Sequence, residues 1–237
     1  MMRLKLLDKL HLTLFGYQAH RRRLLARAPE GPLKAFLSVP FPDKNTPVGE
    51  VPMLALDFET TGLDAKKDQL LSAGWLAIER GEICLKSRYH QIIKTRGELA
   101  EENVVIHQIT DSAKEQGAEL AQVVEALLSA LAGKVMLVHF ARIELTFLRQ
   151  ACIELYGMAP VFPVIDTLAV AKRRLDKRNL PYDAASLRLG NLRQSHQLPG
   201  HFAHNALNDA IATAELLLAE IACAHHGEQL PLKHYLR

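Results

Sequence analysis

Two carboxylates stand two residues apart in the segment Asp57-Phe58-Glu59, at the end of an apolar run that begins at Met53. Side chains two apart on a β-strand point to the same face, so both carboxylates project together while Phe58 points into the core. Holding two carboxylates close costs repulsion unless a cation lies between them, and hard oxygen ligands suit Mg²⁺ or Mn²⁺. The pair therefore predicts a metal site. The alternative interpretation is an ordinary strand end that reaches solvent.

The elements that position this pair follow from the spacing of apolar residues. Short apolar runs and turns indicate strands over about 53–58, 70–78, 83–93 and 135–138. Helical spacing indicates helices over about 118–132, 142–156, 167–176 and 204–223. Three adjacent strands followed by alternating helix and strand predict an α/β fold, a mixed sheet with helices on its faces. Open α/β sheets bind ligands at the carboxyl ends of their strands, where Asp57 and Glu59 are expected to lie.

Proline marks a boundary near the N-terminus, because six of the eleven prolines fall between Pro29 and Pro52. Proline at this density interrupts helices and central strands, so residues 29–52 are expected to form an extended connector. The preceding residues 2–27 are rich in Lys and Arg and carry leucines at helical spacing. We therefore divide the chain into a basic helical arm with its connector (1–50), a main domain (51–225) and a short C-terminal tail (226–237).

Four segments of the main domain resemble, in order, the motifs of one enzyme family. Asp57–Leu63 (DFETTGL) resembles the first motif of the DEDD superfamily of 3′→5′ exonucleases, and Ile106–Thr110 and Val138–Leu148 resemble later ones. His204–Ala210 matches the third motif, H-x-x-x-x-D, which marks the DEDDh branch. That branch includes the proofreading epsilon subunit of bacterial DNA polymerase III, RNase T and oligoribonuclease. The likeness covers residues 51–222, and the ordered set is far more specific than any single motif.

The resemblance implies a ribonuclease-H-like fold and a two-metal hydrolysis that releases nucleoside 5′-monophosphates from a 3′ end. Asp57, Glu59 and Asp209 would hold two divalent ions, Mg²⁺ or Mn²⁺. His204 would accept the proton of the attacking water, since imidazole titrates near neutrality. It stands five residues before Asp209 and so does not share its helix face, which places it on the turn leading into the helix.

One position departs from the family pattern. The carboxylate of the second motif is normally aspartate, and here the aligned residue is Glu144. Glutamate is longer by one C–C bond, about 1.5 Å, and still supplies a carboxylate, so we interpret Glu144 as a metal ligand, directly or through water. The alternative is an ordinary residue on an exposed helix face, with one metal weakly held. Phe140 and Arg142 replace residues that are small or carry amides in the family, and they are expected to narrow the substrate groove or to change its charge.

Substrate contacts are expected next to the motif carboxylates. Thr60 and Thr61 follow Glu59 directly and would bind the sugar of the terminal nucleotide. Ile106 and His107 would pack on a base or bond to a ribose, because terminal nucleotides are held by stacking and sugar contacts. Support of a loop explains these residues equally well. Asp166 is expected to cap the helix that follows it, without a part in catalysis.

Composition sets outer limits on the function. With 49% hydrophobic and 23% charged residues among 237, the chain is typical of a globular protein. No apolar run approaches the roughly 18 residues needed to cross a bilayer, so no membrane partner is expected. The three cysteines are widely spaced and form no C-x-x-C pair, which favours a reducing, cytoplasmic location over a disulfide framework. The net charge of +3 excludes a polycation, although the basic arm can attract phosphates.

Three functional hypotheses follow. The first is a free-standing exonuclease that acts on single-stranded nucleic acid with a free 3′ end. The choice between DNA and RNA is left open, because the metal site contacts the phosphate that both polymers share. The second, favoured by Glu144, is a nucleic-acid-binding or scaffolding module of the same fold with weakened catalysis. The third is a proofreader associated with a polymerase. In that case the N-terminal arm is the segment expected to contact the polymerase or a second copy of the chain.

Overall fold

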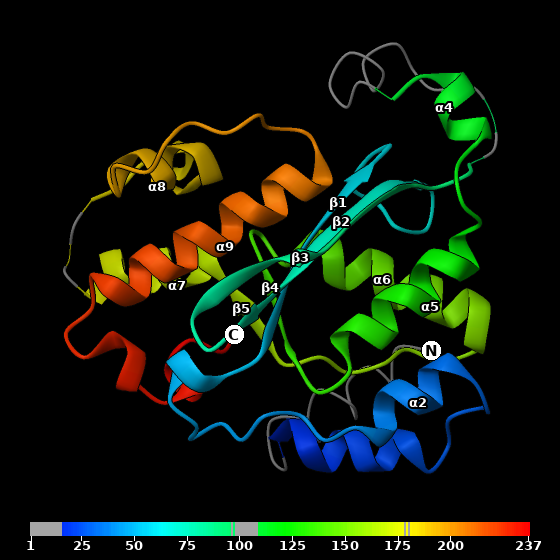
Figure 1. Ribbon diagram of the computed structural model, residues 1–237, viewed down its shortest axis with the longest axis horizontal. Helices are drawn as coiled ribbons and strands as arrows, with labels where there is room; N and C mark the ends of the chain where they lie inside the picture. Colours follow the sequence, from blue (N-terminus) through cyan, green and yellow to red (C-terminus); the bar gives the residue numbers. More distant parts are fainter. Residues whose placement is uncertain (1–15, 96, 98–108, 178, 180) are drawn as a thin grey trace.

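The computed structural model describes residues 16–95, 97, 109–177, 179 and 181–237, and it contains the mixed sheet expected from the sequence (Figure 1). Within these described residues, five strands lie in the order β3-β2-β1-β4-β5. They are β1 (Met53–Thr60), β2 (Leu70–Glu79), β3 (Glu82–Ile92), β4 (Val135–Val138) and β5 (Val164–Asp166). The first three strands are antiparallel neighbours, whereas β4 and β5 run parallel to β1. The short strand β5 was not expected from apolar spacing.

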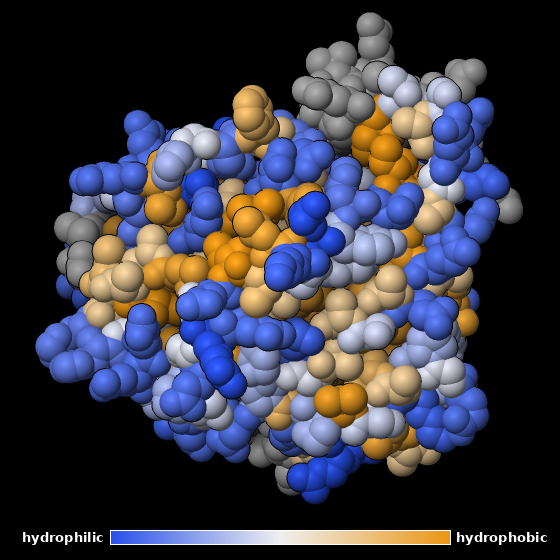
Figure 2. Space-filling model, in the orientation of Figure 1, coloured by the Kyte–Doolittle hydropathy of each residue, from blue (hydrophilic) through white to orange (hydrophobic). Residues whose placement is uncertain are grey.

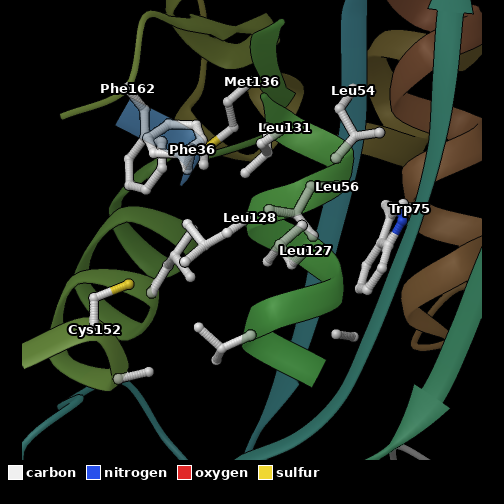
Figure 3. Packing of buried hydrophobic residues seen from close by; sticks show 14 of the residues in the cluster. Phe36, Leu54, Leu56, Trp75, Leu127, Leu128, Leu131, Met136, Cys152 and Phe162 are labelled. Atoms are coloured by element: carbon white, nitrogen blue, oxygen red, sulfur yellow. The ribbon is translucent and has the colours of Figure 1, made fainter. Parts of the chain in front are cut away.

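Helices cover both faces of this sheet. Alternate residues of β1 on one face, Met53 and Ala55, pack with Ala210 and Ala214 of α9 (Ala206–Ala222). The other face packs against α5 (Leu120–Leu131) and α6 (Arg142–Tyr156), and Figure 3 shows Leu54, Leu56 and Trp75 beside the leucines of α5. Because both faces of β1 are buried, its sequence is a continuous apolar run until Asp57.

The expectation of an extended connector over residues 29–52 is wrong in part. Helix α2 (Pro32–Ser38) lies inside this range, with its proline in the first turn, where the missing N–H is not needed. Its residues Leu33, Phe36 and Leu37 are buried in the same core as β1, and the Phe36 and Phe162 ring centroids lie 5.3 Å apart. The described part of the preceding helix spans residues 16–25, within the predicted arm helix.

The C-terminal residues lie along the edge of the sheet. The Arg237 N–H donates to the Val164 carbonyl at 3.0 Å, and Leu236 forms an isolated bridge with Ile165 of β5. The described residues also form α4 (Asp111–Glu115), α7 (Thr167–Lys177), α8 (Leu189–Ser195) and 3-10 turns at Val48–Glu50, Ala184–Leu187, Gly227–Gln229 and Leu232–His234. No helix within the described part of the chain is long and apolar enough to span a membrane.

Candidate active site and metal centre

The structure brings together the four carboxylates singled out in the sequence. Asp57 and Glu59 lie on β1, and Asp209 lies in the first turn of α9. One ligand atom from each of these three lies within 4.8 Å of the others. Glu144, in the first turn of α6, is close enough for its charge to act on Asp57. Burial, with repulsion from the other three carboxylates, raises the pKa of Asp57 well above its usual range.

Glu144 is buried, with 2% of its surface exposed, so its interpretation as a residue on an exposed helix face is wrong. Its Oε2 atom has no hydrogen-bond partner among the residues that the structure describes. A buried carboxylate oxygen without a donor is costly, and further carboxylates increase that cost. A divalent cation would offset this repulsion, and oxygen ligands are those that Mg²⁺ and Mn²⁺ prefer. The residues present therefore fit a divalent metal.

The titration of Glu144 predicts how stability depends on pH when metal is absent. Burial, with repulsion from Asp166 and Glu59, raises the pKa of Glu144 from 4.5 to about 8. Between these values the unfolded chain has released this proton and the folded chain retains it, so stability falls as pH rises through that window. The raised pKa of Asp57 likewise makes stability fall as pH rises. Each pH unit costs up to about 1.4 kcal/mol for one such group.

Urea denaturation in EDTA from pH 5 to pH 8 measures this slope. The wild type is expected to lose a few kcal/mol across the range, since about 1.4 kcal/mol per unit is the limit for one group. Glu144→Gln is expected to lose less, because it removes one titrating group. Glu50→Gln is the matched control, since Glu50 is exposed. Equal slopes in the wild type and Glu144→Gln would contradict the prediction.

Gly74 allows α9 to reach the carboxylates of β1. It pairs with Asp57 across β1 and β2. A Cβ at position 74 would lie 2.2 Å from the Leu207 nitrogen and 2.4 Å from the Ala206 carbonyl carbon. The first turn of α9, which carries Asp209, thus rests against a bare stretch of strand backbone. The sequence interpretation missed this residue, although a lone glycine inside a strand pattern is a signal of close backbone approach.

The segment before α9 binds both oxygens of Asp209. His201 Nε2 lies 2.9 Å from Asp209 Oδ1, and the His204 backbone N–H donates to Oδ2 at 2.8 Å. His204 is exposed with a positive φ of 64°, and the helix begins two residues later at Ala206, so His204 lies on the turn as expected. His201 was left without a role by the sequence interpretation, because its distance from Asp209 in the chain matches no motif.

Asp166 fixes the turn that leads into α6. Its carboxylate accepts hydrogen bonds from the Phe140 and Ala141 backbone N–H groups at 3.0 and 3.1 Å, and from Leu168 N–H at 3.2 Å. The bond to Leu168 confirms the predicted cap of the helix that follows. The other two bonds fix the turn before a second helix, the one that carries Glu144, and Phe140 in that turn has a φ of 66°.

Asp166→Ala is expected to lower the free energy of unfolding by about 2–3 kcal/mol. The substitution leaves backbone N–H groups of two helix ends without an acceptor, and each such donor costs about 1–3 kcal/mol when buried. Removal of a charge near Glu144 offsets part of that loss. Asp183→Ala is the comparison, because Asp183 is exposed and accepts one backbone bond, from Ala185, so about 1 kcal/mol is expected. Chemical denaturation measures both, and equal losses would contradict the role of Asp166.

Two of the residues expected to bind substrate, Thr60 and Thr61, use their hydroxyl groups in hydrogen bonds within their own loop. The Thr60 hydroxyl donates to the Gly62 carbonyl at 2.7 Å, and the Thr61 hydroxyl accepts from the Gln69 N–H at 2.9 Å. Both residues follow Glu59 at the end of β1, next to the carboxylates. Ile106 and His107 lie outside the described residues.

Comparison with known proteins identifies the family. Residues 54–217 match the family model described as Exonuclease, RNase T. The chain belongs to this exonuclease family. The matched range contains the four carboxylates and His204. This chain is 33% identical over 171 residues to the PolC-type DNA polymerase III of Thermotoga maritima, and the match covers 72% of this chain and 12% of that protein. It is 29% identical over 180 residues to the DNA polymerase III subunit epsilon of Treponema pallidum, covering 76% and 80%.

Solved structures share the fold of this chain. Cell-death related nuclease 4 (CRN-4) matches with a TM-score of 0.64 at 17% identity, over 73% of this chain and 64% of that one. Apo exonuclease I matches with a TM-score of 0.65 at 16% identity, over 76% and 44%. These likenesses confirm the predicted ribonuclease-H-like α/β fold. This chain spans about an eighth of the PolC-type relative and less than two thirds of either solved neighbour.

Proposed function

We propose that the chain is a metal-dependent 3′→5′ exonuclease that releases nucleoside 5′-monophosphates from the 3′ end of a strand. The observation that carries this proposal is the convergence of Asp57, Glu59 and Asp209 within 4.8 Å, with buried Glu144 beside them. Such a cluster is unfavourable without a cation, and its members come from three elements that the exonuclease family match spans.

Each residue has a role in this proposal. Asp57, Glu59, Glu144 and Asp209 would hold two Mg²⁺ or Mn²⁺ ions, which would activate water and stabilise the leaving oxygen. His204 would accept the proton of the water, and its exposure on the turn before α9 leaves it open to substrate. The backbone at Thr60 and Thr61 would bind the terminal sugar, since their hydroxyls already support the loop. A contact from Ile106 or His107 with the terminal nucleotide stays part of the proposal.

The proposed partner is nucleic acid with a free, single-stranded 3′ end, in the cytoplasm. Two observations support this partner: the relatives include a polymerase III epsilon subunit, and an E. coli exonuclease I neighbour was solved with single-stranded DNA and zinc. A polymerase or a second copy would contact the N-terminal arm. Leu24 of the arm and Leu33, Phe36 and Leu37 of α2 are buried in the core, so such a contact would involve other residues of this segment.

A time course with labelled oligonucleotides tests the proposal. Single-stranded DNA and RNA, labelled at either end, are incubated with Mg²⁺, Mn²⁺ or EDTA. With metal we expect a ladder of products that shortens from the 3′ end, and in EDTA we expect no reaction. We also expect one of the two polymers, DNA or RNA, to be degraded faster than the other. Intact strands in every metal, with binding still visible by gel shift, would contradict the enzyme and support the nucleic-acid-binding module.

A further inference from the structure

The described part of the chain exposes few large hydrophobic side chains, and three of them lie in loops of the candidate site. The exposed set is Val39, Leu63, Leu85, Phe140, Ile153 and Phe202. Leu63 belongs to the loop after Glu59, Phe140 to the turn before Glu144, and Phe202 to the segment before Asp209. Figure 2 shows a mostly hydrophilic face with hydrophobic residues gathered near its centre, over α9 and the adjacent strands.

Phe202 is the most exposed of these residues. Its exposed fraction is 87%, against 68% for Leu63 and 43% for Phe140. At that exposure the ring gains almost nothing from burial, so it contributes little to the stability of the fold. A large aromatic ring in water beside a site is a feature of binding surfaces for planar or apolar ligands.

The position of Phe202 is fixed by its neighbours. His201 before it and His204 after it each contact Asp209, at 2.9 and 2.8 Å. Consecutive Cα atoms are about 3.8 Å apart, so the Phe202 backbone cannot leave the rim of the carboxylate cluster while these contacts hold. The exposed ring therefore belongs to the segment that holds Asp209, at the rim of the site where the terminal nucleotide would bind.

We propose that Phe202 is the surface on which one unpaired nucleobase at the 3′ end of the substrate stacks. This proposal rests on the proposed function and defines its substrate class, a strand whose end is not base-paired. Every base has a π-face, so the contact discriminates little between sequences and accepts both DNA and RNA. A paired base at a duplex end has less of its face available, so stacking on Phe202 favours single strands.

Binding measurements without turnover test this proposal. Fluorescence anisotropy follows single-stranded oligonucleotides with 5′ labels in Ca²⁺ or EDTA, and in a second set each of the last three 3′ nucleotides is made abasic in turn. Phe202→Ala is expected to weaken binding of the intact strand about 5- to 100-fold, the range that loss of one stacked base gives. Phe202→Trp is expected to retain affinity. Leu85→Ala, an exposed residue of β3, is the matched control and is expected to change nothing.

The abasic strands distinguish stacking from damage to the loop. At one abasic position the wild type is expected to bind as weakly as Phe202→Ala, because the partner of the ring is gone. The same loss from Phe202→Ala at every abasic position, or no loss on the intact strand, would overturn the proposal. Mn²⁺ affinity by calorimetry is expected to be equal in both proteins, and a loss there would also overturn it. Failure of all strands to be cleaved would overturn the proposed function alone, because binding is read without turnover.

Discussion

Asn in place of Asp57 is expected to abolish metal-dependent cleavage and, at the same time, to raise the stability of the metal-free protein. Asp57 is surrounded by Glu144, Glu59 and Asp209, and burial with their repulsion raises its pKa well above the usual range. Its charge therefore opposes folding in the absence of a cation. The neutral, isosteric amide removes that cost but no longer supplies an anionic ligand.

We expect cleavage to fall by ~10³-fold or more, because bound metal contributes several kcal/mol to this chemistry. In EDTA at pH 7.5 the free energy of unfolding should rise by about 1 kcal/mol or more, since one pKa unit corresponds to about 1.4 kcal/mol. Oligonucleotide cleavage and urea denaturation measure the two effects. Asp43→Asn is the control, because Asp43 is exposed and asparagine can keep its bond to the Asn45 N–H. Wild-type cleavage by Asp57→Asn would refute the site, and unchanged stability would refute the repulsion.

Alanine in place of Gly74 is expected to damage both stability and activity. The added methyl group would lie 2.2 to 2.5 Å from backbone atoms of Ala206 and Leu207, so strand and helix must separate. Overpacking of this kind costs about 1–3 kcal/mol. Because Asp209 lies two residues beyond Leu207, the same shift moves it away from Asp57, and a displacement near 1 Å costs about 10²-fold in rate.

Gly190→Ala provides the matched control. Gly190 lies in α8, and a Cβ there would meet nothing within 4 Å, so helix propensity should leave it neutral or slightly stabilised. Thermal denaturation, Mn²⁺ titration and strand cleavage compare the two variants. We expect Gly74→Ala alone to bind Mn²⁺ weakly. Full Mn²⁺ affinity in that variant would show that α9 can shift without moving Asp209.

The sequence by itself determined the local features of this protein. The period of two places Asp57 and Glu59 on one face of β1, and the apolar run before them predicts a buried strand. The offset between His204 and Asp209 predicts a turn followed by a helix, and α9 begins at Ala206. Helical spacing placed α5 and α6 within a few residues of their bounds. These features depend on a few residues that are neighbours in the sequence, so the sequence of this chain is enough to predict them.

Only the tertiary structure decided how these pieces meet. It buried Glu144 beside β1 and placed His201 within hydrogen-bond distance of Asp209. It also brought Asp166 to the turn before α6, where its carboxylate accepts a hydrogen bond from Ala141, 25 residues earlier in the chain. Apolar spacing alone did not reveal that α2 packs into the main core, because proline density dominated that segment. Contacts of this kind depend on which backbone segments approach each other, as α9 does over Gly74. That approach is set by the packing of the whole core, and no local pattern of residues predicts it.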